Sequence, residues 1–311
     1  MKAQILATAT LFAVFSGMLS AADARLLNLV MPDATVLAGV NVDQAKATPF
    51  GQYVLTTLLG SQAQQLQQLA TLTGFDPRRD VSELLLASGS APGKRTGLAV
   101  ARGVFDLAKI AAAAQSAGAG AETYGGVSII EEPEHQNGFA FLDSTLVVAG
   151  DLANVKAAID RRNEGPTIPA ALAARVNQLS SAQDAWAIST VPPSTLRPSA
   201  AAPPAAGVDM QNALQKIESA SAGVKFGSMV VVTGQAQAAT PQDASSVGDV
   251  LKLFVSMAQL QAAKHPEAAA LAQSLVVSTQ GSTVKITLSL PEAQIQQLVK
   301  PKAAARKIVQ M

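Results

Sequence analysis

The chain of 311 residues contains no cysteine. Disulfides, thiol catalysis and cysteine-based metal sites are therefore excluded. Without covalent cross-links the fold depends on its hydrophobic core, and a chain of this length can bury a core of sufficient size. We expect one large domain or two smaller ones.

The N-terminus has the parts of a secretory signal peptide. Lys2 supplies a positive charge, an apolar run extends from Ile5 to Leu19, and small residues follow. Small residues at the −3 and −1 positions fit cleavage after Ala22 or after Ala24. The apolar run is shorter than the ~20 residues that a membrane-spanning helix needs. We predict an exported protein, periplasmic or extracellular, with an uncleaved N-terminal membrane anchor as the alternative.

The charge balance argues against a strongly charged partner. The chain has 23 Lys and Arg against 22 Asp and Glu, and charged residues make up 14% of it. Ordinary globular chains contain about 25% charged residues. We therefore expect no nucleic-acid partner.

Residues 30–165 are predicted to form a first α+β module, following a signal peptide over residues 1–24. Strand patterns cover residues 34–42, 84–88, 97–101, 127–131 and 139–149, the last with a hairpin turn at Asp143. A helix follows Pro49, with a break at Gly60 and a glycine stop signal at Gly74. Asp106 and Asp151 are predicted to cap two further helices.

Residues 166–300 are predicted to form a second module, followed by a basic tail at residues 301–311. Strand patterns cover residues 185–190, 221–226, 229–233, 275–279 and 283–290, and a Pro/Ala-rich loop covers residues 191–207. Helices are expected at residues 212–219 and 247–258. The spacing of Ser289 and Glu292 predicts a capping box for a last helix.

The fold class predicted from this order is α+β. Two similar modules are expected, each an antiparallel sheet with helices packed on one face. The repeated order of elements suggests an internal duplication. One irregular α+β domain is the alternative interpretation.

Two short motifs resemble catalytic or phosphate-binding sequences but have the wrong context. Ser282 and Lys285 have S-x-x-K spacing within a strand pattern, whereas the catalytic motif needs the serine to begin a helix. The loop from Gly89 to Lys94 is one residue short of a phosphate loop and precedes a strand. We interpret it as a hairpin turn.

The two histidines do not form an acid–base pair in the sequence. His135 follows several glutamates and a proline, so the alternatives are a divalent metal site and a solvated acidic loop, which we favour. His265 precedes Pro266 and is expected to end a helix. We predict no catalytic, cofactor-binding or metal-ligating residue.

Arg78 and Arg79 are the candidate ligand or partner residues. An arginine pair can bind a carboxylate or a phosphate. The structural interpretation, which we favour, is a turn at Asp76-Pro77 with Asp80 pairing to an arginine. The basic tail, which contains Lys300, Lys302, Arg306 and Lys307, is similarly interpreted as a solvated terminus or as a contact with an anionic surface. Trp186 is expected in the core.

Four segments together resemble a group of uncharacterised exported bacterial proteins. These segments are PDATVLAGVNV from Pro32, GFDPRRDV from Gly74, AVARGVFD from Ala99 and FLDSTLVVAGD from Phe141. The similarity extends over about Pro32 to Arg162. It implies α+β modules with a GFDP-type turn in the cell envelope, and it implies no established activity.

The function predicted from these observations is a non-enzymatic exported protein that binds a partner or ligand through sheet faces or loops. The alternative is a small-ligand carrier or an enzyme with a cleft between the two modules, because pockets favour domain interfaces. A third interpretation, a membrane-tethered structural protein, requires a retained N-terminus. The partner's identity stays open.

Export predicts a processed N-terminus. N-terminal sequencing of the protein recovered from the envelope or the medium should find Asp23 or Arg25 as the first residue. A recovered protein that still begins at Met1 would contradict the signal-peptide interpretation.

Overall fold

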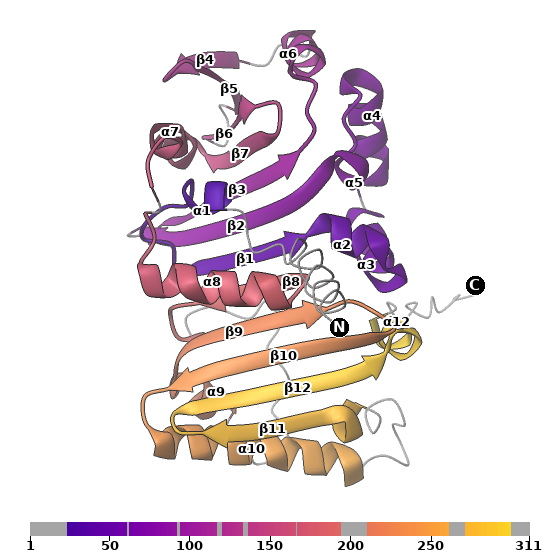
Figure 1. Cartoon of the computed structure of the whole chain (residues 1–311), viewed down its shortest axis with the longest axis vertical. Coiled ribbons are helices and arrows are strands. Elements are labelled where there is room, and N and C mark those ends of the chain that lie inside the picture. Colours follow the sequence, from indigo (N-terminus) through magenta and orange to yellow (C-terminus); the bar gives the residue numbers. More distant parts are fainter. Residues whose placement is uncertain are drawn as a thin grey trace, which may run out of the picture.

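One continuous antiparallel sheet of twelve strands organises the molecule (Figure 1). The computed structural model describes residues 24–60, 62–91, 94–116, 120–132, 136–165, 167–193, 210–260 and 271–299. The strand order is β11-β12-β10-β9-β8-β1-β2-β3-β7-β6-β5-β4. The strands of each predicted module are therefore neighbours, and the two sets join at β1 and β8.

The first half contributes seven strands to this sheet. They are β1 (Val36–Asn41), β2 (Val81–Ala91), β3 (Lys94–Gly103), β4 (Gly120–Tyr124), β5 (Val127–Glu132), β6 (Asn137–Asp143) and β7 (Leu146–Asp151). Its helices are α1 (Ala24–Leu27), α2 (Val42–Ala47), α3 (Pro49–Gly60), α4 (Ala63–Thr73), α5 (Pro77–Asp80), α6 (Leu107–Ser116) and α7 (Leu152–Arg161).

The second half begins with helix α8 (Ala170–Ala182) and contributes five strands. They are β8 (Ala185–Ser189), β9 (Ile217–Lys225), β10 (Met229–Ala238), β11 (Leu275–Gln280) and β12 (Thr283–Pro291). Its other helices are α9 (Met210–Gln215), α10 (Pro241–Leu260) and α12 (Glu292–Val299).

Strands β1 and β8 join the two halves by antiparallel pairing, with Ala38 opposite Ala187. Beside this pair the Asp184 side chain, only 3% exposed, accepts from Lys225 Nζ at 2.7 Å and from the Phe226 amide at 2.7 Å. The Asp184 carbonyl accepts from the Asn41 amide at 2.7 Å. Asp184, which precedes β8, therefore contacts β1 through its backbone carbonyl and the end of β9 through its carboxylate.

The two faces of the sheet are covered by different helices in the two halves. Residues directly opposite each other in antiparallel strands share a face, so the register assigns each residue to a side. We call the side against which α8 packs the α8 face, and the opposite side the α10 face. In Figure 1, α8 crosses in front of the sheet and α10 lies behind β11.

The first-half core lies on the α8 face. There the chain segment around α1 and helices α7 and α8 cover a set of side chains that are at most 4% exposed. This set includes Leu37, Leu85, Leu98, Val100, Ile129, Ala140, Leu146 and Val148. Trp186, 6% exposed, belongs to the same core, as expected.

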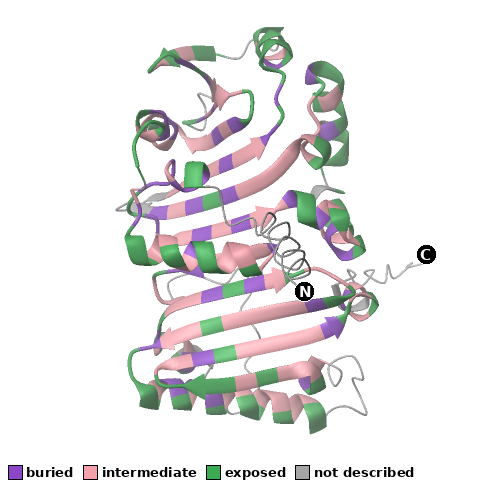
Figure 2. Cartoon of the chain, viewed as in Figure 1, coloured by how far each residue is buried: buried purple, intermediate pink, exposed green. Residues whose placement is uncertain are grey.

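The second-half core lies on the α10 face. Val247 of α10 packs with Val284, and Ile295 of α12 packs with Leu290 and Val230. On the α8 face strands β10, β11 and β12 carry mostly Thr, Ser, Gln and Lys, with Val231 and Val276 as apolar exceptions. In Figure 2 this side faces the viewer, and no described helix crosses in front of β10 and β12.

Several local predictions are confirmed. Gly74 ends α4 with a left-handed φ of 73°, and Asp106 Oδ1 accepts from the Lys109 amide at 3.1 Å. The hairpin at Asp143 joins β6 and β7. Gly89 lies in β2, which pairs with β3, so the hairpin interpretation of that loop also holds.

Other local predictions were wrong. Ser289 lies in β12, paired with Val231, so it does not cap a helix. Asp151 precedes α7 but makes no capping bond, because its side chain accepts from the Gly97 amide of β3 at 2.7 Å. Helix α8 and strand β4 were not predicted.

The α+β fold class and its antiparallel sheet are confirmed. The corresponding strands follow the same spatial order, β1-β2-β3-β7-β6 and β8-β9-β10-β12-β11. The halves bury opposite faces, however, so the internal duplication stays a prediction.

The packing of Trp186 on Gly39 gives a stability prediction. A Cβ atom at residue 39 would lie 2.5 Å from Trp186 Cε2, so Gly39→Ala must displace the indole. We expect the free energy of unfolding to fall by about 1–3 kcal/mol in urea denaturation. Gly60→Ala is the control, because, apart from its chain neighbours and its own helix backbone, no described atom lies within 4 Å of its Cβ position. An unchanged denaturation midpoint for Gly39→Ala would contradict this packing.

Candidate functional site: an uncovered apolar surface

The α10 face of the first half carries an apolar surface that no core cluster includes. Two rows of side chains cross strands β2, β3, β7 and β6 on this face. The first row is Leu86, Ala99, Ala149 and Phe139, and the second is Leu84, Ala101, Val147 and Phe141. We call these eight residues the apolar shelf. None of them is buried, and Leu86 is 46% exposed.

The first row of the apolar shelf lines a concavity of about 710 Å³. Gly97 lies beside Ala99 on the same face and adds no side chain, which leaves room above the strand. Small-molecule sites are typically concave, mostly apolar and of this size. The apolar shelf is therefore the candidate functional site.

Polar groups lie at one end of the concavity. Asp151, Asn137 and Glu131 contribute to its lining. A hydrogen bond to Glu122 raises the pKa of Glu131, whereas the hydrogen bond between Lys156 and Glu122 lowers the pKa of Glu122. The concavity thus joins an apolar floor to a rim that contains carboxylates.

An aromatic series extends from the apolar shelf toward helices α5 and α6. The ring centroids of Phe139 and Phe141 lie 5.9 Å apart, those of Phe141 and Phe105 5.2 Å, and those of Phe105 and Phe75 5.5 Å. Edge-to-face and tilted contacts at these distances favour ordered rings. The series connects the concavity to the turn around Asp76.

Unbroken apolar runs in two strands indicate the apolar shelf in the sequence, but the strand predictions did not use them. Strands with one solvated face alternate between apolar and polar residues, as β12 does with Thr-Val-Lys-Ile-Thr-Leu-Ser-Leu. Strand β2 instead contains Leu-Leu-Leu-Ala, and β7 begins Leu-Val-Val-Ala. A strand that is apolar at every position presents an apolar surface on both sides of the sheet.

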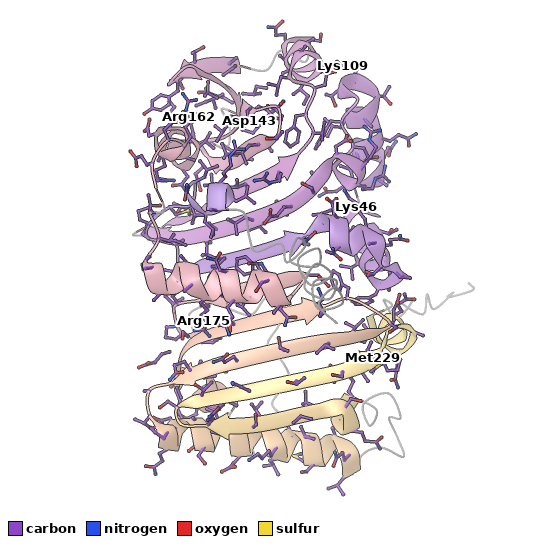
Figure 3. All side chains as sticks on the ribbon, viewed as in Figure 1. Lys46, Lys109, Asp143, Arg162, Arg175 and Met229 are labelled. Carbon is purple, nitrogen blue, oxygen red and sulfur yellow. The ribbon has the colours of Figure 1, made fainter. Side chains whose placement is uncertain are left out.

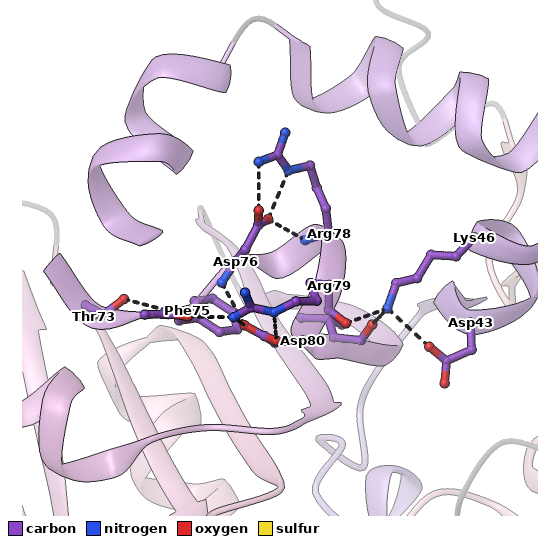
Figure 4. Close-up of polar contacts among 10 residues, drawn as sticks. Asp43, Lys46, Thr73, Phe75, Asp76, Arg78, Arg79 and Asp80 are labelled. Carbon is purple, nitrogen blue, oxygen red and sulfur yellow. Dashed lines mark hydrogen bonds and ion pairs between the residues drawn. The ribbon is translucent and has the colours of Figure 1, made fainter. Parts of the chain in front are cut away.

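Arg78 and Arg79, the ligand candidates from the sequence, are paired with carboxylates of their own turn (Figure 4). Arg78 donates to both oxygens of Asp76 at 2.9 and 2.7 Å. Arg79 donates to Asp80 at 2.6 and 2.8 Å and to the Gly74 carbonyl at 2.7 Å. These contacts match the interpretation of this segment as a turn in which Asp80 pairs with an arginine. Ligand binding by the two arginines stays an untested prediction.

The remaining sequence candidates fall mostly outside the described residues. These are Ala22, the Pro/Ala-rich loop from residue 194 onward, His135, His265 and the tail at residues 301–311. Ala24 is the first residue of α1. Among the described residues, no group of three or more His, Asp or Glu is arranged to hold a metal ion. No described helix is both long and apolar enough to cross a membrane.

A partly buried carboxyl group, that of Glu83, lies on the α8 face of β2. Glu83 stands opposite Arg102 of β3, with 3.9 Å between its Oε2 atom and Arg102 Nε. Burial raises the pKa of Glu83 to about 7, because partial removal of the carboxylate from water disfavours its charged form. The group therefore titrates near neutral pH.

The raised pKa of Glu83 gives a pH prediction. Between pH 4.5 and about 7 the folded state keeps a proton that the unfolded state has released. The free energy of unfolding should therefore fall as the pH rises through this window. Glu83→Gln should reduce this decrease in urea denaturation at pH 5 and pH 8, whereas the exposed Glu218→Gln should retain it. An identical pH dependence in Glu83→Gln and the wild type would contradict the shift.

The fold resembles that of TP0453 in three of its crystal forms. Form III aligns with a TM-score of 0.56 at 8% identity, covering 88% of this chain and 96% of TP0453. Forms IV and I give TM-scores of 0.53 and 0.50 at 9% identity. No protein-family profile and no curated protein sequence matches the chain. Because the identity is so low, the likeness concerns the fold alone.

Proposed function

We propose that this protein is an exported, non-enzymatic binding protein that holds an apolar or amphiphilic small molecule on the apolar shelf. The observation that supports this proposal is a concavity of about 710 Å³ whose floor is a row of partly exposed apolar side chains. Export rests on the N-terminal sequence pattern.

The physical driving force is removal of apolar surface from water. Leu86 is 46% exposed on a face whose other side is a closed core. Contiguous exposed apolar surface on a soluble protein commonly marks an interaction site. A ligand that covers the apolar shelf gains about 25 cal/mol for each Å² of apolar surface removed from water.

The position of the concavity favours the sheet face over a cleft between the modules. The halves meet through the paired strands β1 and β8, with Trp186 packed on Gly39. The concavity is lined by β2, β3, β5, β6 and β7, all of the first half. We therefore place the ligand on the apolar shelf.

Binding can be tested with the fluorescent amphiphile 8-anilinonaphthalene-1-sulfonate. Leu86→Asp places a charge in the first row and should weaken saturable binding at least about tenfold, since full burial of a leucine side chain is worth about 1.5–3 kcal/mol. Ala99→Trp should weaken it by filling the concavity without adding charge.

Val276→Asp is the matched control, because Val276 is 62% exposed and lies on the polar side of the second half. It should bind the probe as the wild type does. Equal affinities of the wild type, Leu86→Asp and Ala99→Trp, all with native circular dichroism, would exclude the apolar shelf as the binding site.

A further inference from the structure

Strand β11 forms one of the two edges of the sheet. The strand order ends at β4 on one side and at β11 on the other, and Figures 1 and 3 place these strands at opposite ends of the sheet. Among the described strands, β11 pairs only with β12, in register from Leu275 to Gln280. Backbone groups of alternate residues in an antiparallel strand point to opposite sides. The outer side of β11 therefore presents N–H and C=O groups that no described strand satisfies.

The sequence of β11 lacks the features that normally keep a free edge from pairing. Exposed edges usually carry charged side chains, prolines or bulges. The six residues of β11, Leu-Val-Val-Ser-Thr-Gln, contain neither a charge nor a proline, and their register with β12 has no shift. The other edge differs, because β4 contains Glu122, which lies 2.6 Å from Lys156 Nζ. Strand β11 is therefore the edge that can accept another strand.

Helix α10 holds β11 in place on one face and leaves the edge open. Val277 packs in the same core cluster as Val247 of α10, and a Cβ atom at Gly248 would lie 2.5 Å from Thr279 Oγ1. On the α8 face, Val276 is 62% exposed and Ser278 is exposed. An incoming strand thus meets a partner that is already ordered, which lowers the entropic cost of association.

A second copy of β11 is complementary to the first. Directly opposite residues in antiparallel strands share a face, so a two-fold axis normal to the sheet must oppose one residue to its own copy. Ser278 is small and exposed, whereas Val277 lies under α10. Centring the pair on Ser278 places Val276 opposite Gln280 and Val277 opposite Thr279. No like charges meet in this register.

We propose that the mature chain forms a two-fold symmetric dimer by antiparallel pairing of β11 with β11 of a second copy, centred on Ser278. The same surface is used by both copies, so the contact closes at two chains, with β4 at each end of the joined sheet. Pairing of one β11 with another copy's β4 would instead continue into an open filament. An interface built mainly from one strand pair is small, which gives a reversible dimer.

The first test uses single cysteines, because the chain has none of its own. Under mild oxidation of the mature chain, Ser278→Cys should form a disulfide-linked dimer, since opposed Cβ atoms about 4.5–5.5 Å apart approach disulfide spacing. Gln280→Cys lies on the same face but about 14 Å from its copy, so it should not cross-link. Gln235→Cys on β10 and Thr123→Cys on the other edge are exposed controls for random collision.

The second test measures the dimer without a cross-link, by sedimentation equilibrium over a range of concentrations. The mass of the wild-type mature chain should rise reversibly toward that of a dimer. Ser278→Lys should weaken dimerisation at least about tenfold, because two ammonium groups would meet at the two-fold axis. Gln235→Lys is the matched control, since it adds the same charge to the same face two strands away, and it should dimerise normally.

Three results would overturn the proposal: a monomer at every concentration, cross-linking of Ser278→Cys no faster than that of Gln235→Cys, or unchanged dimerisation in Ser278→Lys with native circular dichroism. The dimer does not depend on the apolar shelf, which lies in the first half. Ser278→Lys should therefore still bind the fluorescent amphiphile, and Leu86→Asp should still dimerise.

Discussion

The antiparallel pairing of β1 with β8 is the interaction on which the rest of the architecture depends. It converts two sets of strands into one twelve-stranded sheet, so neither half has an open edge at the junction. Asp184, which precedes β8, contacts β1 through its backbone carbonyl and the end of β9 through its buried carboxylate. Gly39 leaves room for the indole of Trp186 on the same pair. A buried carboxylate is tolerated only when it is paired and hydrogen-bonded, and the contacts with Lys225 and the Phe226 amide meet this requirement.

In each half, one face of the sheet lies outside the core clusters formed by the described residues. The first half buries the α8 face and the second half buries the α10 face. In the second half the uncovered side is polar, with Thr233, Thr287 and Lys285 on adjacent strands, and is compatible with water. In the first half the uncovered side is the apolar shelf. This difference in side-chain chemistry, rather than the backbone arrangement, distinguishes a hydrated surface from a candidate binding surface.

The first half thus offers two different environments on its two faces. The larger concavity has an apolar floor and suits a ligand driven by the hydrophobic effect. A smaller concavity beside α1 is lined mainly by polar and charged side chains, among them Arg25, Asp143 and Arg162. The closed core of Leu85, Val100 and Val148 lies on the α8 face of the strands that form the apolar shelf. The same strands thus carry the closed core on one face and the apolar shelf on the other.

The sequence by itself determined the α+β class, most strands and the local turn chemistry, because these depend on short-range patterns. The Gly74 helix stop and the Asp106 cap are examples, since each involves residues a few positions apart. The cap predicted for Asp151 failed because a distant amide, that of Gly97, competes for its side chain. The unbroken apolar run of β2 indicated an apolar surface on both sides of the sheet. Locating the apolar shelf also required the register between the strands. Only the tertiary structure decided which face each half buries and that Arg25 and Arg162 line one concavity, because these relations join residues more than a hundred positions apart.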